Sequence, residues 1–168
     1  MRNDSPLHYW DTPIFIAWLQ NEKRDPLEMA GIRELVLQIH ENKARLITSV
    51  ITHTEVLRSR LSPSAIKVWE NVFKRRNVVQ ATTDQRVARL SSEIRDYYQK
   101  SKDINGLRTL SSPDSIHLAT AILYKVDYFY TFDEKGIKGR GLIPLSGNVA
   151  GYRLIICKPI GSQLIFGL

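Results

Sequence analysis

Cysteine is nearly absent from this sequence: Cys157 is the only one among 168 residues. A single cysteine cannot form an intramolecular disulfide, and it excludes a cysteine-rich zinc site as well. Such usage fits a reducing compartment. No apolar run approaches the roughly 20 residues of a membrane-spanning helix, and the opening stretch MRNDSPLHYWDT lacks the apolar core of a signal peptide. We therefore expect a cytoplasmic protein with no membrane partner.

Internal repeats, low-complexity tracts and glycine-rich phosphate loops are also missing from the sequence. The chain is long enough to bury one sizeable core, and nothing in it reads as a linker. We therefore predict a single domain over residues 1–168.

Acidic residues are fewer than basic ones: the sequence has 17 Asp and Glu residues and 24 Lys and Arg residues, which gives a formal net charge of +7. A basic balance of this size favours polyanionic partners, with nucleic acid the first candidate and a membrane surface the second.

Short β-branched or aromatic runs alternate with amphipathic stretches along nearly the whole chain. Strands are predicted in PLHYW (6–10), RLITSV (45–50), NVVQ (77–80) and DYFYTF (127–132), with a fifth candidate in RLIIC (153–157). Helical patterns cover 12–20, 26–42, 62–73 and 82–100, and further helices follow residues 50 and 111. This alternation predicts an α/β fold with a central, mainly parallel sheet of four to five strands.

Local signals place several helix ends and loops. Thr12 is the expected N-cap of the first helix, and Thr82 has capping-box spacing with Gln85. A polar loop is expected over 101–112. Gly136, Gly139 and Gly141 mark the loop between the last two strands.

Four acidic residues fall at the ends of predicted elements. Asp11 directly follows the first strand and Asp133 the fourth, whereas Asp114 opens a helix and Glu55 lies early in the helix after the second strand. Each acid alone is ordinary, as a cap, a turn residue or a solvated helix residue. Nothing about caps or turns requires four acids at the same edge of a parallel sheet, which is where ligands bind in such folds.

Clustered carboxylates repel one another, and without a cation at least one is expected to hold a proton near neutral pH. A divalent ion removes this conflict, and Mg²⁺ or Mn²⁺ prefers such hard oxygen ligands. An ion of this kind also polarises a phosphate and activates water, while a basic surface gathers a phosphate backbone. The pattern therefore favours a nuclease.

The sequence resembles the PIN-domain family, and within it the VapC-like toxins of bacterial toxin–antitoxin systems. The resemblance is carried by WDTPIFIAWL around Asp11, SVITHTEVLR around Glu55, PDSIHLATAI around Asp114 and YFYTFDEKG around Asp133. It implies a three-layer α/β/α fold and a Mg²⁺- or Mn²⁺-dependent endoribonuclease. It also implies an RNA substrate, a small cognate antitoxin protein and a homodimer.

Residue by residue, the resemblance assigns Asp11, Glu55, Asp114 and Asp133 to the family's acidic metal site. Thr131 falls at the family's hydroxyl position beside the last acid. Glu134 is an extra acid that we place outside the site. Phe132 stands where many relatives carry asparagine, which removes one amide from that corner.

Other residues near these motifs have simpler interpretations. His117 lies three residues after Asp114 on the same helix face, and we interpret it as a core or interface histidine. Arg108 is read as an ordinary loop arginine. The helix over 62–73 is expected to expose Trp69, Val72 and Phe73, which makes a partner surface plausible.

Two other functions compete with the nuclease. The first is a catalytically inactive or housekeeping PIN protein that only binds nucleic acid, although a pure binder does not need four mutually repelling acids. The second is a phosphatase on a doubly wound sheet, with Asp11 as nucleophile. The haloacid-dehalogenase pattern requires a second aspartate two residues later, where this sequence has Pro13.

Overall fold

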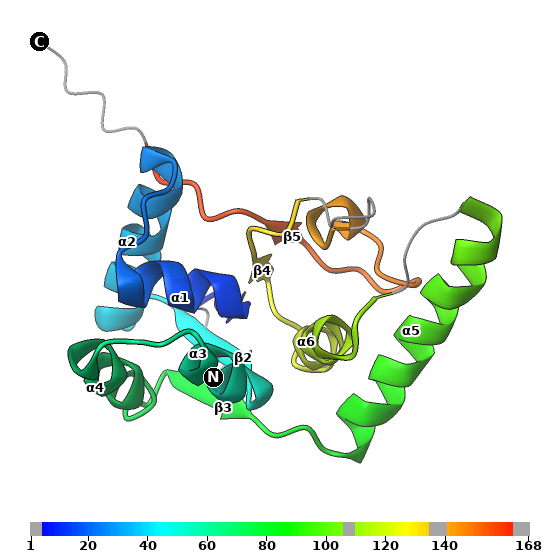
Figure 1. Cartoon of the computed structure of the whole chain (residues 1–168), viewed down its shortest axis with the longest axis horizontal. Coiled ribbons are helices and arrows are strands. Elements are labelled where there is room, and N and C mark those ends of the chain that lie inside the picture. Colours follow the sequence, from blue (N-terminus) through cyan, green and yellow to red (C-terminus); the bar gives the residue numbers. More distant parts are fainter. Residues whose placement is uncertain (1–4, 106–109, 135–140, 163–168) are drawn as a thin grey trace, which may run out of the picture.

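The structure, a computed structural model, describes residues 5–105, 110–134 and 141–162. Within these residues the chain forms one five-stranded sheet with helices on both sides (Figure 1). The strands are β1 (Leu7–Trp10), β2 (Arg45–Ser49), β3 (Val78–Ala81), β4 (Tyr128–Tyr130) and β5 (Ile156–Cys157). The helices are α1 (Thr12–Gln20), α2 (Pro26–His40), α3 (Ile51–Arg58), α4 (Pro63–Val72), α5 (Gln85–Asn105) and α6 (Ser112–Leu123), with a short 3₁₀ helix, η1 (Ile143–Leu145).

Every pair of neighbouring strands runs parallel, in the order β3-β2-β1-β4-β5. The first strand therefore lies at the centre of the sheet, between β2 and β4. In such a sheet all strands end at the same edge, so residues that follow β1, β2 and β4 meet there. The predicted parallel α/β sheet is confirmed, including the fifth strand.

Two cores hold the layers together, because successive side chains of a strand point to opposite faces. Trp10 and Leu46 point into the core that the sheet shares with α1–α4. Tyr9, Ile47 and Phe129 point into the core shared with α5 and α6. Figure 1 shows these helix groups on opposite sides of the sheet. The fold is the three-layer α/β/α arrangement that the sequence predicted.

Two predicted N-caps are wrong, and one predicted loop is wrong at its ends. Asp11, not Thr12, caps α1, since its carboxylate accepts the Thr12 N–H at 2.8 Å. Asp84, not Thr82, caps α5 by accepting the N–H groups of Arg86 and Val87. An aspartate carboxylate reaches the free N–H groups of a first turn more readily than threonine does. Of the predicted polar loop over 101–112, residues 101–105 instead belong to α5, which ends at Asn105, and Ser112 belongs to α6.

Trp69, Val72 and Phe73 were expected to be exposed, and this expectation is also wrong, since Phe73 is partly buried and the other two are buried. Trp69 is fully buried, with its ring 5.1 Å from that of Phe15 and 4.6 Å from that of Phe73. Val72 is buried in the same core. The first helix covers this face of α4, so the apolar bulk belongs to the core and gives no reason to expect a partner there.

Two sequence expectations lie outside the described residues: the loop glycines Gly136 and Gly139, and Arg108. Across the described ranges, no helix is long and apolar enough to cross a membrane.

Candidate active site

The four predicted acids line one cavity at the edge of the sheet where the strands end. Asp11 joins β1 to α1, Glu55 projects from α3, Asp114 lies in the first turn of α6, and Asp133 follows β4. The cavity has a volume of about 320 Å³. Its lining residues are Asp11, Thr12, Pro13, Ile16, Glu55, Asp114, His117 and Asp133. Residues that lie up to 122 positions apart thus converge as the strand order requires.

Asp11 is the most deeply buried of the acids, with 6% of its surface exposed. Its Oδ1 accepts the Thr12 N–H, and its Oδ2 accepts a hydrogen bond of 2.7 Å from the Thr131 hydroxyl. Thr131 also accepts the N–H of Asp133 at 3.1 Å, so one hydroxyl connects the acids that follow β1 and β4. Burial raises the pKa of Asp11 above its usual value, although the charge of His117 and these hydrogen bonds act against the shift.

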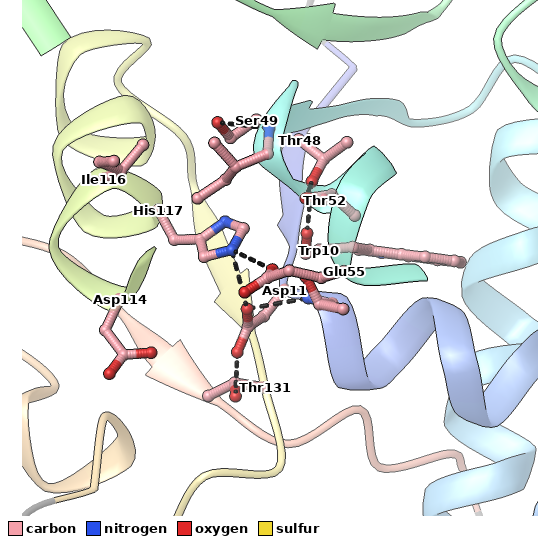
Figure 2. Close-up of polar contacts among 12 residues, drawn as sticks. Trp10, Asp11, Thr48, Ser49, Thr52, Glu55, Asp114, Ile116, His117 and Thr131 are labelled. Atoms are coloured by element: carbon pink, nitrogen blue, oxygen red, sulfur yellow. Dashed lines mark hydrogen bonds and ion pairs between the residues drawn. The ribbon is translucent and has the colours of Figure 1, made fainter. Parts of the chain in front are cut away.

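His117 is a member of the site that the sequence interpretation assigned to the core. It is indeed buried, but its Nε2 lies 3.0 Å from Glu55 Oε2 and 3.7 Å from Asp11 Oδ1 (Figure 2). Burial opposes the charged imidazolium, yet the hydrogen bond to Glu55 and the charges of Asp11 and Glu55 raise the pKa of His117 above its usual value. One signal was visible in the sequence: His117 follows Asp114 by three residues and shares its helix face.

Glu55 is held from two sides. Its Oε2 accepts hydrogen bonds from the Thr12 hydroxyl and from His117 Nε2. Burial disfavours its charged form, but the two hydrogen bonds and the charge of His117 outweigh burial and lower the pKa of Glu55. Glu55 is therefore ionised at neutral pH.

Asp114 and Asp133 complete the lining. Asp114 stands apart from the bonded group in Figure 2, and its Oδ2 accepts a hydrogen bond of 2.6 Å from Ser111, the residue that caps α6. Burial and the nearby charge of Asp114 raise the pKa of Asp133. Burial, aided by the neighbouring acid, disfavours the charged forms of Asp11 and Asp133, and a bound cation would offset this cost.

The residues fit a hard divalent ion in chemistry, since carboxylate oxygens are the ligands that Mg²⁺ and Mn²⁺ prefer. As the side chains lie, however, no three His, Cys, Asp or Glu residues of the described ranges are grouped closely enough to hold one ion. The acids share a cavity, but they do not form a ready-made coordination shell.

Two residues that follow β4 lie near the site without lining the cavity. Glu134 lies outside the cavity and pairs with Lys158 at 2.8 Å. Phe132, at the position of the missing asparagine, lies under the Arg24 guanidinium, whose carbon is 3.9 Å from the ring centroid.

Comparison with known proteins identifies the family. Residues 9–139 match the PIN domain, a range that contains all four acids. The chain belongs to the PIN domain family. This is a family of nucleases. No curated protein sequence matches the chain significantly.

Two solved structures resemble this PIN domain in fold. One is the crystal structure of VapBC2 from Rickettsia felis bound to a DNA fragment from their promoter. The TM-score is 0.56 at 12% identity, over 90% of this chain and 97% of that chain. The other is a toxin–antitoxin complex from Klebsiella pneumoniae, with a TM-score of 0.50 at 20% identity, over 94% of this chain and all of that one. The similarity to these two structures supports the α/β/α fold described above.

The pKa shifts predict how the metal-free protein responds to pH. A histidine whose pKa is raised by folding contributes stability below its usual value of 6.5 and loses it as pH rises through the higher folded value. We therefore expect the melting temperature in EDTA to fall as pH rises above 6.5. His117→Gln carries no titrating ring, so its curve should be flatter. Parallel curves for the two proteins in differential scanning fluorimetry would contradict the pairing of His117 with the acids.

Proposed function

We propose that this PIN domain is a Mg²⁺- or Mn²⁺-dependent endoribonuclease that hydrolyses RNA phosphodiester bonds. The observation that carries the proposal is the convergence of Asp11, Glu55, Asp114 and Asp133 on one cavity at the carboxyl edge of the sheet. These four carboxylates would hold the ion. When bound, such an ion supplies a Lewis acid for the scissile phosphate and a water of lowered pKa.

The protein's own side chains prepare the cavity for this chemistry. Thr131 fixes one oxygen of Asp11 and the backbone of Asp133, so the acids after β1 and β4 keep their spacing. Thr12 joins α1 to Glu55 on α3 in the same way. Positions fixed in advance lower the cost of organising the site during the reaction.

Cleavage in the presence and absence of metal tests the function. A single-stranded RNA should be cut when Mg²⁺ or Mn²⁺ is present and left intact in EDTA. If no cleavage is seen with either ion across a panel of RNAs, while RNA is still bound, the domain is a binding module without catalysis.

RNA binding is expected to be mainly electrostatic, as the net charge of +7 suggests. Each phosphate neutralised on a single strand should contribute a slope of roughly −0.7 to the log–log dependence of affinity on salt. Fluorescence anisotropy with labelled RNA in EDTA measures this slope without cleavage. A dissociation constant that hardly changes between low and high salt would refute the electrostatic account.

We further propose that the nuclease is the toxin of a toxin–antitoxin pair. The motifs resemble VapC-like toxins, and the fold is shared with the two structures above, VapBC2 and a toxin–antitoxin complex. A cavity lined by four carboxylates is also a suitable receptor for an arginine from a small antitoxin, which would form charge-assisted hydrogen bonds there. The homodimer remains a proposal from the resemblance, to be tested by light scattering.

A further inference from the structure

Both ring nitrogens of His117 are engaged by groups of the protein. The side chain is buried, with 1% of the residue exposed. Its Nδ1 lies 2.7 Å from the Tyr9 hydroxyl on β1, and its Nε2 lies 3.0 Å from Glu55 Oε2. The ring thus connects the central strand of the sheet to an acid of the candidate active site. Figure 2 shows the contact with Glu55.

The partners determine which ring nitrogen carries hydrogen. An ionised carboxylate only accepts hydrogen bonds, so His117 must donate to Glu55 from Nε2, whether the ring is neutral or charged. A nitrogen that carries hydrogen has no lone pair with which to bind a metal or take a proton from water. His117 therefore serves as neither a metal ligand nor a general base through Nε2.

Tyr9 holds the ring from the other side. Its hydroxyl accepts the backbone N–H of Ser49 at 3.0 Å, which leaves its own hydrogen free to be donated to Nδ1 of the neutral ring. Ser49, Tyr9, His117 and Glu55 then form a continuous series of hydrogen bonds that begins at the β2 backbone. Because Tyr9 is fully buried, water does not compete for these bonds.

The series ends on only one oxygen of Glu55. Oε2 accepts hydrogen bonds from both His117 and Thr12. Among the described residues, no hydrogen bond reaches Oε1 of Glu55. The carboxylate is thus anchored by one oxygen, in a residue that lines the cavity.

We propose that His117 is a positioning residue that, held by Tyr9, fixes Glu55 through Oε2 and leaves Oε1 as its single donor to the metal-binding cavity. The inference rests on the proposed nuclease function and assigns a role to a residue outside the family's four acids. Groups that orient a metal ligand through its second atom commonly change metal affinity or activity by about 10–100-fold when removed.

Two substitutions of His117 separate a hydrogen-bond donor from a space-filling ring. His117→Leu keeps bulk but removes the donor, and we expect kcat for RNA to fall by about 10–100-fold and half-activating Mn²⁺ to rise. KM for RNA should not change, because His117 contacts the acid and not the substrate. His117→Gln places an amide N–H near the position of Nε2 and should restore most of kcat. His8→Leu, which removes another buried histidine away from the cavity, is the matched control.

Tyr9→Phe removes only the hydroxyl that holds the ring. It should lower kcat, whereas Tyr9→Phe combined with His117→Leu should be no slower than His117→Leu alone, since Tyr9 acts through His117. The control is Tyr98→Phe, because Tyr98 is also buried and its hydroxyl also accepts a backbone N–H, from Ala150 at 3.2 Å. Multiplicative losses in the double variant would overturn the proposed series.

A spectroscopic measurement tests the same point without catalysis. Long-range ¹H–¹⁵N spectra of the metal-free protein should show hydrogen on Nε2 of His117, and a bare Nε2 would overturn the proposal. Wild-type kcat and Mn²⁺ dependence in His117→Leu would overturn it too, as would equal losses in His117→Leu and His117→Gln. If the wild-type protein cuts no RNA with either ion, the nuclease function fails, and the spectrum still decides the hydrogen-bond series.

Discussion

Replacing Asp114 with asparagine is expected to lower the rate of RNA cleavage by about 10²–10³-fold or more, the loss typical of removing a key electrostatic group from an active site. Asparagine has nearly the same shape and can still accept the Ser111 hydroxyl at the start of α6. It lacks the negative charge with which a carboxylate attracts a divalent ion. Single-turnover cleavage of labelled RNA with Mn²⁺ measures the effect.

The fold of this variant should be intact, and the metal-free protein should be at least as stable as wild type. The charge of Asp114 contributes to the raised pKa of Asp133, so its removal relieves a repulsion. Glu134→Gln is the matched control, because it makes the same chemical change beside the cavity in a residue paired with Lys158. Wild-type cleavage by Asp114→Asn would show that the acid assignment is wrong.

Expression of the wild-type chain alone is expected to arrest bacterial growth, because an active endoribonuclease degrades RNA that the cell needs. Asp11→Ala and Asp114→Asn should be harmless at equal protein levels, whereas Glu134→Gln should arrest growth like wild type. Colony counts after induction, with immunoblots for protein abundance, measure the outcome. Normal growth with abundant wild-type protein would count against the toxin role and leave the nuclease role to the RNA assay.

The proposed antitoxin adds a second arm to this experiment. A short reading frame upstream that codes for a small DNA-binding protein should restore growth when it is co-expressed. If that protein inserts an arginine among the carboxylates, its inhibition in vitro should weaken as Mn²⁺ rises, because the two cations compete for one site. Inhibition that is independent of Mn²⁺ would place the antitoxin's contacts elsewhere.

The arrangement of the acids could be predicted because it follows from local patterns and one topological rule. Apolar runs before Asp11 and Asp133 mark strands, and the ends of parallel strands meet at one edge. The sequence could therefore indicate that these acids and Asp114 line a common cavity, as the structure shows. It could not indicate that Thr131 would join Asp11 to Asp133, because that contact depends on the register of β1 and β4.

The errors came from residues whose environment is set by distant segments. The apolar bulk of Trp69 looked like an exposed surface because nothing near it in the sequence shows that Phe15 covers it. The interpretation of His117 as a core histidine was right about its burial but missed its contacts with the acids, because helical periodicity reveals which face is buried but not what lies opposite. Tyr9 and Glu55, which give that histidine its role, come from β1 and α3.

Calorimetric titration of the protein with Mn²⁺ tests the central claim most directly, since it asks whether the four acids form one metal site. We predict saturable binding to the wild-type chain and to Glu134→Gln, and its loss in Asp114→Asn, with all three proteins folded. Binding of equal affinity in Asp114→Asn, or no binding to the wild type, would contradict the account.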